Sequence, residues 1–97
     1  MTEKTSVTVR IAGEEHTIRA SAQPDYTRKC AKLVDDRIHE IRLAAGLVDG
    51  QKAAILAALS IADECFQAHE ELERAKVELA ARVEALAAHV EGALPLP

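Results

Sequence analysis

The chain has 97 residues, is 48% hydrophobic, and contains one Phe, one Tyr and no Trp as large aromatic core residues. A chain this short forms at most one small domain that is marginally stable alone, so we expect an obligate oligomer. A net charge of −4 argues against nucleic acid as a partner, and without a membrane-length apolar run or signal peptide we expect a cytoplasmic protein that binds no membrane.

Residues 7–20 predict a β-hairpin. Apolar and polar residues alternate in residues 7–11 and again in 16–20, and Gly-Glu-Glu at 13–15 interrupts them. A period of two indicates strands with one buried face. An isolated hairpin is marginal in water, so we expect its apolar face to pack on helices or to join strands of a second subunit. Arg10 and Arg19 fall on the opposite face and remain available to a partner.

An amphipathic helix follows the hairpin. Pro24 suits the first turn of a helix, Gln23 precedes it, and Gly46 suits the end. Arg37 and Arg42 fall among the polar positions outside the apolar face. That apolar face carries residues at three- and four-residue spacing: Tyr26, Cys30, Leu33, Val34, Ile38 and Ile41.

A second helix is predicted from Asp49, which with Gly50 forms a natural cap, to Gly92. Such a helix extends roughly 60 Å, about twice the diameter of a small domain. A chain of 97 residues cannot cover it alone. We therefore expect its apolar face to pack on a partner chain.

The first part of this helix, residues 53–66, has an unusually wide apolar face. Only a narrow polar strip, including Ser60, interrupts it, so we expect burial against more than one neighbour. Its many alanines let helices approach closely. We interpret this segment as the core between subunits. The residues expected there are Ile55, Leu59, Ile61, Ala62, Cys65 and Phe66.

The remainder of the helix has the 3.5-residue repeat of a coiled coil. With Ile55 as position a of the heptad, His69 and Lys76 are two polar a positions that reduce stability or fix register. The predicted seam consists of Leu72, Leu79, Val83, Leu86 and Val90. The sequence thus predicts an α+β chain with a head at residues 1–67, a coiled-coil tail at 68–92 and a flexible terminus at 93–97.

No catalytic chemistry is indicated by the sequence. Asp63 and Glu64 lie on the outer side of the helix, and no His stands at a spacing typical of a base and a nucleophile. The four glycines are scattered singly, so a phosphate-binding loop is not expected. Cys65 and His69 are one helical turn apart, but a structural zinc site needs two compact ligand pairs. We predict no enzyme, no cofactor and no metal.

In this order of elements the sequence resembles the ZapA family of bacterial cell-division proteins. Three blocks carry the resemblance: VTVRIAG at 7–13, CAKLVDDRI at 30–38, and AALSIADE at 57–64. The third block is similar to the family's AALNIADEL segment. Together the blocks span nearly the whole chain in the family's order.

The resemblance implies a protein that binds the tubulin-like division protein FtsZ and bundles its filaments at the mid-cell division ring. It also implies head dimers that join through antiparallel coiled-coil tails into a tetramer. The family's charged head residues correspond to Arg10, Arg37 and Arg42, and the strand geometry adds Arg19. Several family members have a basic residue after the hairpin glycine, whereas this chain has Glu14 and Glu15.

Two other hypotheses remain open on the sequence alone. A generic coiled-coil dimerisation or scaffold module would form the same oligomer without binding FtsZ. A redox or metal sensor would use Cys30 and Cys65, although free thiols on apolar helix faces usually behave as small hydrophobic residues.

Overall fold

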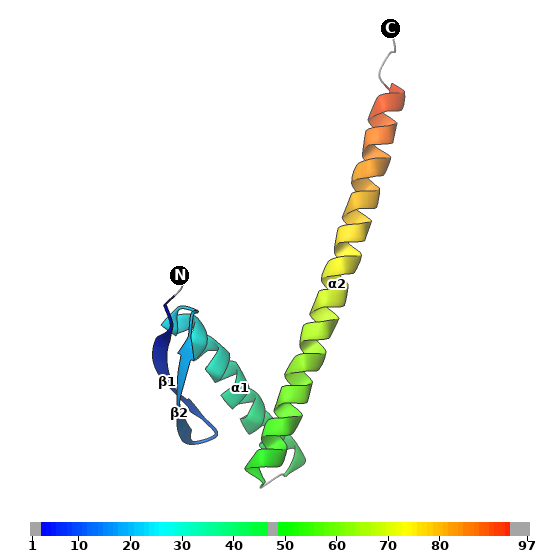
Figure 1. Ribbon diagram of the computed structural model, residues 1–97. Helices are drawn as coiled ribbons and strands as arrows, with labels where there is room; N and C mark the ends of the chain where they lie inside the picture. The colour runs from blue at the N-terminus through cyan, green and yellow to red at the C-terminus, as the bar shows by residue number, and fades with distance from the viewer. Residues whose placement is uncertain (1–2, 47–48, 94–97) are drawn as a thin grey trace. The chain divides into compact units, whose positions relative to one another are not determined.

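The computed structural model describes residues 3–46 and 49–93, which form two strands and two helices (Figure 1). In chain order these are β1 (Thr5–Ile11), β2 (Glu14–Ala20), α1 (Pro24–Ala45) and α2 (Gly50–Ala93). The predicted α+β order of hairpin, helix and long helix is confirmed. The predicted flexible terminus lies outside the described residues, except for Ala93 at the end of α2.

The two strands pair in antiparallel register and are joined by a two-residue turn. Ala12 and Gly13 have φ angles of 54° and 81°, and positive φ at both central positions defines the type I′ turn typical of such hairpins. The predicted interruption at residues 13–15 is therefore wrong in position. Glu14 and Glu15 already belong to β2, where they pair with Ile11 and Arg10, because the tight turn returns the chain directly into the strand.

The inner face of β1 supplies the first part of the core. Val7 and Val9 are 2% and 6% exposed, and they pack with Ala31 of α1. Ile18 of β2 pairs with Val7 on the same face but remains exposed. Only β1 therefore rests closely on α1, and β2 lies farther from the helix.

Both ends of α1 lie where the sequence predicts them. Gln23 has an extended backbone and its carbonyl accepts from the Thr27 N–H at 3.1 Å, and Pro24 begins the helix. Proline suits this position because the first helical N–H groups have no partner within the helix. At the other end, Gly46 has φ 64°, the left-handed conformation that glycine adopts without strain.

The start of α2 is capped by Asp49 and packs on α1. The Asp49 Oδ1 atom accepts from the Gln51 N–H at 3.0 Å and, more weakly, from the Lys52 N–H at 3.4 Å. The predicted cap is thus confirmed. Behind it, Ala53 and Ala57 are fully buried against Ile38 of α1. Alanine has no bulk beyond Cβ, so the two helices approach closely here.

Contacts divide the chain into two units, Met1–Ile61 and Ala62–Pro97. The first unit contains the hairpin, α1 and the start of α2. The predicted boundary at residue 67 falls inside the second unit. In the part of the chain that the structure describes, no single helix is long and apolar enough to cross a membrane. Residues 24–45 and 50–92 meet that test only as a bent pair.

The turn conformation generates a stability prediction. An L-residue in the left-handed region is strained by about 1 kcal/mol, and asparagine tolerates that region best among non-glycine residues. Ala12→Asn should therefore raise the free energy of unfolding by up to about 1 kcal/mol, measured by urea denaturation at fixed protein concentration. Gly13→Ala is the opposite control and should lower it by about as much. An unchanged or lower stability of Ala12→Asn would contradict the assigned turn.

Candidate functional site

Arg10 and Arg19 lie on the outer face of the hairpin. The register pairs Arg10 with Glu15 and Arg19 with Ser6, and residues paired across two strands share a face. All four side chains are exposed. The outer face therefore presents two guanidinium groups and one carboxylate, with Thr8 and Thr17 between them, whose hydroxyl oxygens are 3.3 Å apart.

Arg37 lies within the packing of the first unit rather than on its open surface. Its side chain is 16% exposed, and its Nη1 donates to Ser60 Oγ of α2 at 2.8 Å. Its Nε lies 3.7 Å from a carboxylate oxygen of Glu40 on the same helix. The expectation that Arg37 faces solvent is wrong, because Ser60 and Glu40 hold its guanidinium between α1 and α2.

Arg42 lies in the last turn of α1, and its guanidinium rests against Gly50 at the start of α2. Its Nη2 is 2.6 Å from the position that a Cβ on residue 50 would occupy, so a larger residue there would displace the end of the Arg42 side chain. Its Nε is buried and has no hydrogen-bond partner among the described residues. The rest of the side chain is half-buried and borders a hollow below the hairpin turn.

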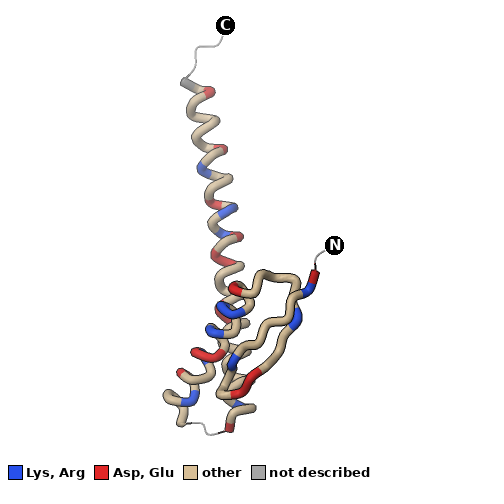
Figure 2. The backbone as a smooth tube through the Cα atoms, turned by 90° about the vertical axis from the view of Figure 1, so that its left-hand side faces the viewer, with Lys and Arg blue, Asp and Glu red and all other residues tan. Residues whose placement is uncertain are grey.

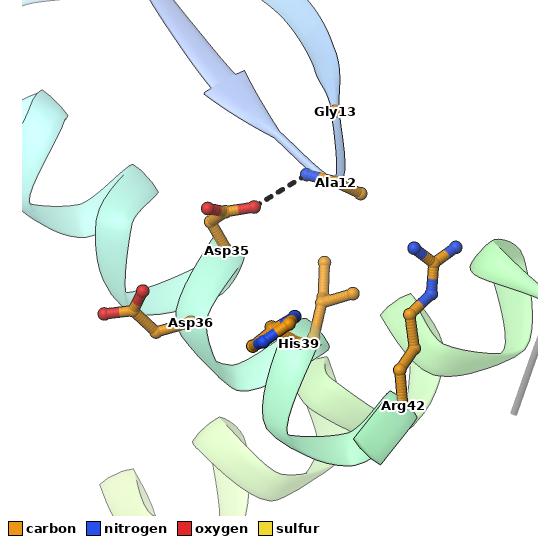
Figure 3. A pocket seen from close by; sticks show the side chains of 7 residues that line it. Ala12, Gly13, Asp35, Asp36, His39 and Arg42 are labelled. Carbon is orange, nitrogen blue, oxygen red and sulfur yellow. Dashed lines mark hydrogen bonds between the residues drawn. The ribbon is translucent and has the colours of Figure 1, made fainter. Parts of the chain in front are cut away.

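This hollow has a volume of about 350 Å³ and lies between the hairpin turn and α1 (Figure 3). A second hollow of about 380 Å³ shares Ala12, Ile38 and Arg42 with it and extends toward the start of α2. Arg42 thus borders both spaces. The first hollow is lined by Ala12, Gly13, Asp35, Asp36, Ile38, His39 and Arg42.

The two carboxylates of the first hollow already have partners. Asp35 Oδ1 accepts from the Ala12 N–H at 2.8 Å, which fixes the hairpin turn to α1, as Figure 3 shows. Asp36 points away from the turn and accepts from Lys32 Nζ at 2.9 Å. His39 and Arg42 are the other two polar side chains of the lining. Because a guanidinium matches the planar geometry of a carboxylate, Arg42 is the group of this lining that suits an acidic side chain of a partner.

The wide apolar face predicted for residues 53–66 is divided between two environments. Its alanines 53 and 57 are fully buried, whereas Ile55, Leu59 and Phe66 are 54%, 62% and 71% exposed. Ile61 is half-buried, and Ala62 and Cys65 are exposed. Contiguous exposed apolar surface of this kind marks an interaction site. Large side chains therefore remain available for a partner where small ones contact α1.

The predicted coiled-coil seam is exposed throughout the second unit. This holds for Leu72, Leu79, Val83, Leu86 and Val90. A shallow apolar groove also lies there, with Leu79 and Val83 in its lining. Among the described residues no group of three or more His, Cys, Asp or Glu side chains is arranged to hold a metal ion, and Cys30 and Cys65 are free and exposed.

The sequence predicts Arg10, Arg19, Arg37 and Arg42 as partner-binding residues. It does not single out Asp35 or His39, which the structure places in the lining of the first hollow. The sequence places both acidic residues at 35–36 on the polar side of the helix, and nothing in it distinguishes Asp35 from Asp36. Only the fold brings Asp35 beneath the turn, because the hairpin turns back over the middle of α1.

Comparison with known proteins places this geometry in a family. The family model described as "Cell division protein ZapA" matches residues 7–90. A protein of that name from Geobacillus thermodenitrificans is 38% identical over 76 residues, covering 78% of this chain and 84% of the relative. One from Bacillus licheniformis is 35% identical over 74 residues, covering 76% and 87%.

Solved structures agree with these relatives. The structure called "ZapA mutant dimer from Geobacillus stearothermophilus" is 39% identical, with a TM-score of 0.66, and the match covers 82% of this chain and 95% of that one. A conserved bacterial protein from Pseudomonas aeruginosa has a TM-score of 0.71 at 24% identity, covering 89% and 96%, which shows the fold alone.

A matched pair of variants tests the hydrogen bond that the Ala12 N–H donates to Asp35. Asp35→Ala removes the carboxylate that accepts from the Ala12 N–H and should lower the free energy of unfolding by about 1 kcal/mol or more. Asp36→Ala makes the same charge change but removes only an exposed ion pair, and should change it by less than about 0.5 kcal/mol. Thermal unfolding at fixed concentration compares them. Equal effects of the two substitutions would show that Asp35 is not an anchor.

Proposed function

This chain belongs to the ZapA family of cell division proteins, and from that membership we propose that it binds FtsZ filaments and cross-links them at the mid-cell division ring. The role in cell division follows from the family. The observation that supports cross-linking is the exposure of the large apolar side chains along α2, because they favour joining several copies of the chain. The proposed role needs no catalytic residue and no cofactor.

Head dimers form, in this proposal, through the exposed apolar side chains at the start of α2. The relative from Geobacillus stearothermophilus was solved as a dimer. Burying Ile55, Leu59 and Phe66 against a second copy removes apolar surface from water at roughly 25 cal/mol per Å². The residues assigned to this interface are Ile55, Leu59, Ile61, Ala62, Cys65 and Phe66.

Tetramers form when the tails of two dimers pair through the seam at Leu72, Leu79, Val83, Leu86 and Val90. Antiparallel pairing separates the two pairs of heads. Each pair can then bind a different filament, and several contacts along one filament add avidity to a weak single-site affinity. Bundling thus requires both the filament contact of the head and the pairing of the tails.

The filament contact is assigned to Arg10, Arg19 and Arg42 of the head. FtsZ is acidic, and exposed guanidinium groups pair well with carboxylates. Arg42 is supported most strongly, because it borders two hollows and its Nε has no acceptor among the described residues. Arg37 is assigned a positioning role instead, since it joins α1 to Ser60.

The tail generates the first functional prediction. Leu79→Gln with Leu86→Gln keeps a good helix former at each position but replaces seam side chains with polar ones. The double variant should remain a head dimer by light scattering. In low-speed sedimentation of GTP-assembled FtsZ it should bind filaments without pelleting them as bundles. Persistent tetramers would remove the tail from the proposed mechanism.

The head generates the second functional prediction. Arg42→Glu should weaken co-sedimentation with FtsZ filaments by roughly tenfold, because one carboxylate contact becomes repulsive. Arg74→Glu, which makes the same charge change at an outer position of the tail, should keep wild-type binding and oligomer mass. Equal binding by both variants would remove Arg42 from the contact. No co-sedimentation of the wild-type protein at low and moderate salt would favour a scaffold module without FtsZ binding.

A further inference from the structure

A groove lies along the edge of β1 that does not pair with β2. It has a volume of about 240 Å³, and no residue of β2 lines it. It is therefore bounded by one strand and one helix. Its lining residues are Thr8, Val9 and Arg10 of β1, and Arg28, Ala31, Lys32 and Asp35 of α1.

The hairpin register directs backbone groups of β1 into this groove. A two-residue turn is closed by a hydrogen-bonded pair, here Ile11 with Glu14. Hydrogen-bonded and non-bonded pairs alternate along antiparallel strands, so Val7 and Val9 also bond β2. The N–H and C=O groups of residues 6, 8 and 10 point the other way. Among the described residues, β1 pairs with no strand other than β2, so this edge is open to a further strand.

The walls of the groove are rich in cationic groups. Arg10 rises from β1, and Arg28 and Lys32 lie one helical turn apart on α1 (Figure 2 shows basic residues on both elements). Arg28 contacts Asp25 at 3.0 Å and Lys32 contacts Asp36 at 2.9 Å. Both pairs are exposed, and exposed pairs exchange partners at little cost in free energy.

Asp35 is the acidic residue in the lining, against the three basic residues Arg10, Arg28 and Lys32. Asp35 uses Oδ1 to accept from the Ala12 N–H. A lysine is protonated across the neutral range, and the Asp36 hydrogen bond raises the pKa of Lys32 above its ordinary value. The groove therefore combines an open strand edge with two cations on its helical wall, Arg28 and Lys32.

We propose that this groove binds an extended acidic segment of a partner protein, which adds to β1 as a third strand. Main-chain hydrogen bonds to residues 6, 8 and 10 provide the affinity, as in other cases of strand addition. Carboxylates on the face of the added strand that is turned to α1 pair with Arg28 and Lys32 and provide the selectivity. The inference does not depend on the FtsZ assignment, because it defines the partner by its chemistry alone.

Charge favours an acidic segment over a second copy of β1. A second β1 strand would bring its own Lys4 and Arg10 to the edge, together with Arg28 and Lys32 of its α1. Like charges that face each other across strands are destabilising. An acidic strand instead meets Arg28 and Lys32 on the helical wall of the groove.

The test uses the full-length protein and the synthetic peptide acetyl-TEVEVET-amide, with acetyl-TQVQVQT-amide as the uncharged control. Saturating acidic peptide should protect the backbone amides of Ser6, Thr8 and Arg10 from hydrogen exchange, measured by NMR. Amides of Val7 and Val9, already bonded to β2, should not change. The uncharged peptide should bind roughly tenfold more weakly or worse. Binding without this alternating protection would overturn strand addition.

Two proline variants distinguish peptide binding at the β1 edge from peptide binding at the β2 edge. Thr8→Pro removes an amide from the groove edge, a position where a strand tolerates proline. Thr17→Pro loses the same contact between the Thr8 and Thr17 hydroxyls but alters the opposite edge. Thr8→Pro should weaken peptide binding by roughly tenfold or more, and Thr17→Pro by less than about twofold. Equal peptide binding by the two variants would overturn the proposal.

Oligomer mass and a charge variant complete the experiment. If Thr8→Pro folds but loses head dimers, a second copy occupies this edge and the proposal is wrong. If Thr8→Pro does not fold, Arg28→Gln with Lys32→Gln decides: it should weaken acidic-peptide binding by roughly tenfold and reduce its salt dependence. Wild-type affinity of that double variant would overturn the proposal, whether or not the protein pellets with FtsZ filaments.

Discussion

The close approach of α1 and α2 through alanine is the constraint on which the rest of the structure depends. Ala53 and Ala57 can lie against Ile38 only because they lack bulk, and they bury little apolar area in doing so. Side chains that could bury more, such as Ile55 and Leu59, are left on the other sides of the helix. The described part of a single chain thus has a narrow core, and most of its large apolar side chains stay exposed. The proposed head dimer would cover part of this surface, and under that proposal folding and assembly are coupled.

The second half of α1 makes a different contact at each successive helical turn. Asp35 holds the hairpin turn, Ile38 packs under α2, and Arg42 rests on Gly50. These three side chains follow one another at helical spacing, so they share one face of α1. Consequently the residues that contact the hairpin turn and α2 also line the hollow below the turn. These residues are Asp35, Ile38 and Arg42. The geometry of the hollow is set by the local fold of the first unit, and the proposed contact at Arg42 needs little rearrangement.

The elements with strong local signals were predictable from the sequence. Gly46 ends α1 because of its backbone freedom, and Asp49 caps α2 with its own carboxylate. The turn was misplaced because Ala12, which has no preference for positive φ, occupies its first central position. The core was misjudged for another reason. Apolar residues at three- and four-residue spacing include Leu33 and Tyr26 of α1, which are exposed. The buried residues there include Thr27 and Ala31, since burial within one chain depends on the distance between elements.

Successive residues of β1 point in opposite directions, so neighbouring residues have different proposed roles. Val7 and Val9 turn their side chains to α1 and their backbone to β2, so they are committed to the fold. Thr8 and Arg10 have the reverse arrangement, with side chains on the outer face and backbone at the open edge. An Arg10 guanidinium that contacts an acidic filament and an Arg10 backbone that bonds an added strand therefore use different atoms. If both proposals hold, one hairpin binds the filament on its outer face and the added strand at its edge at the same time. The alternation of side chains along β1, which also predicted the strand, makes this possible.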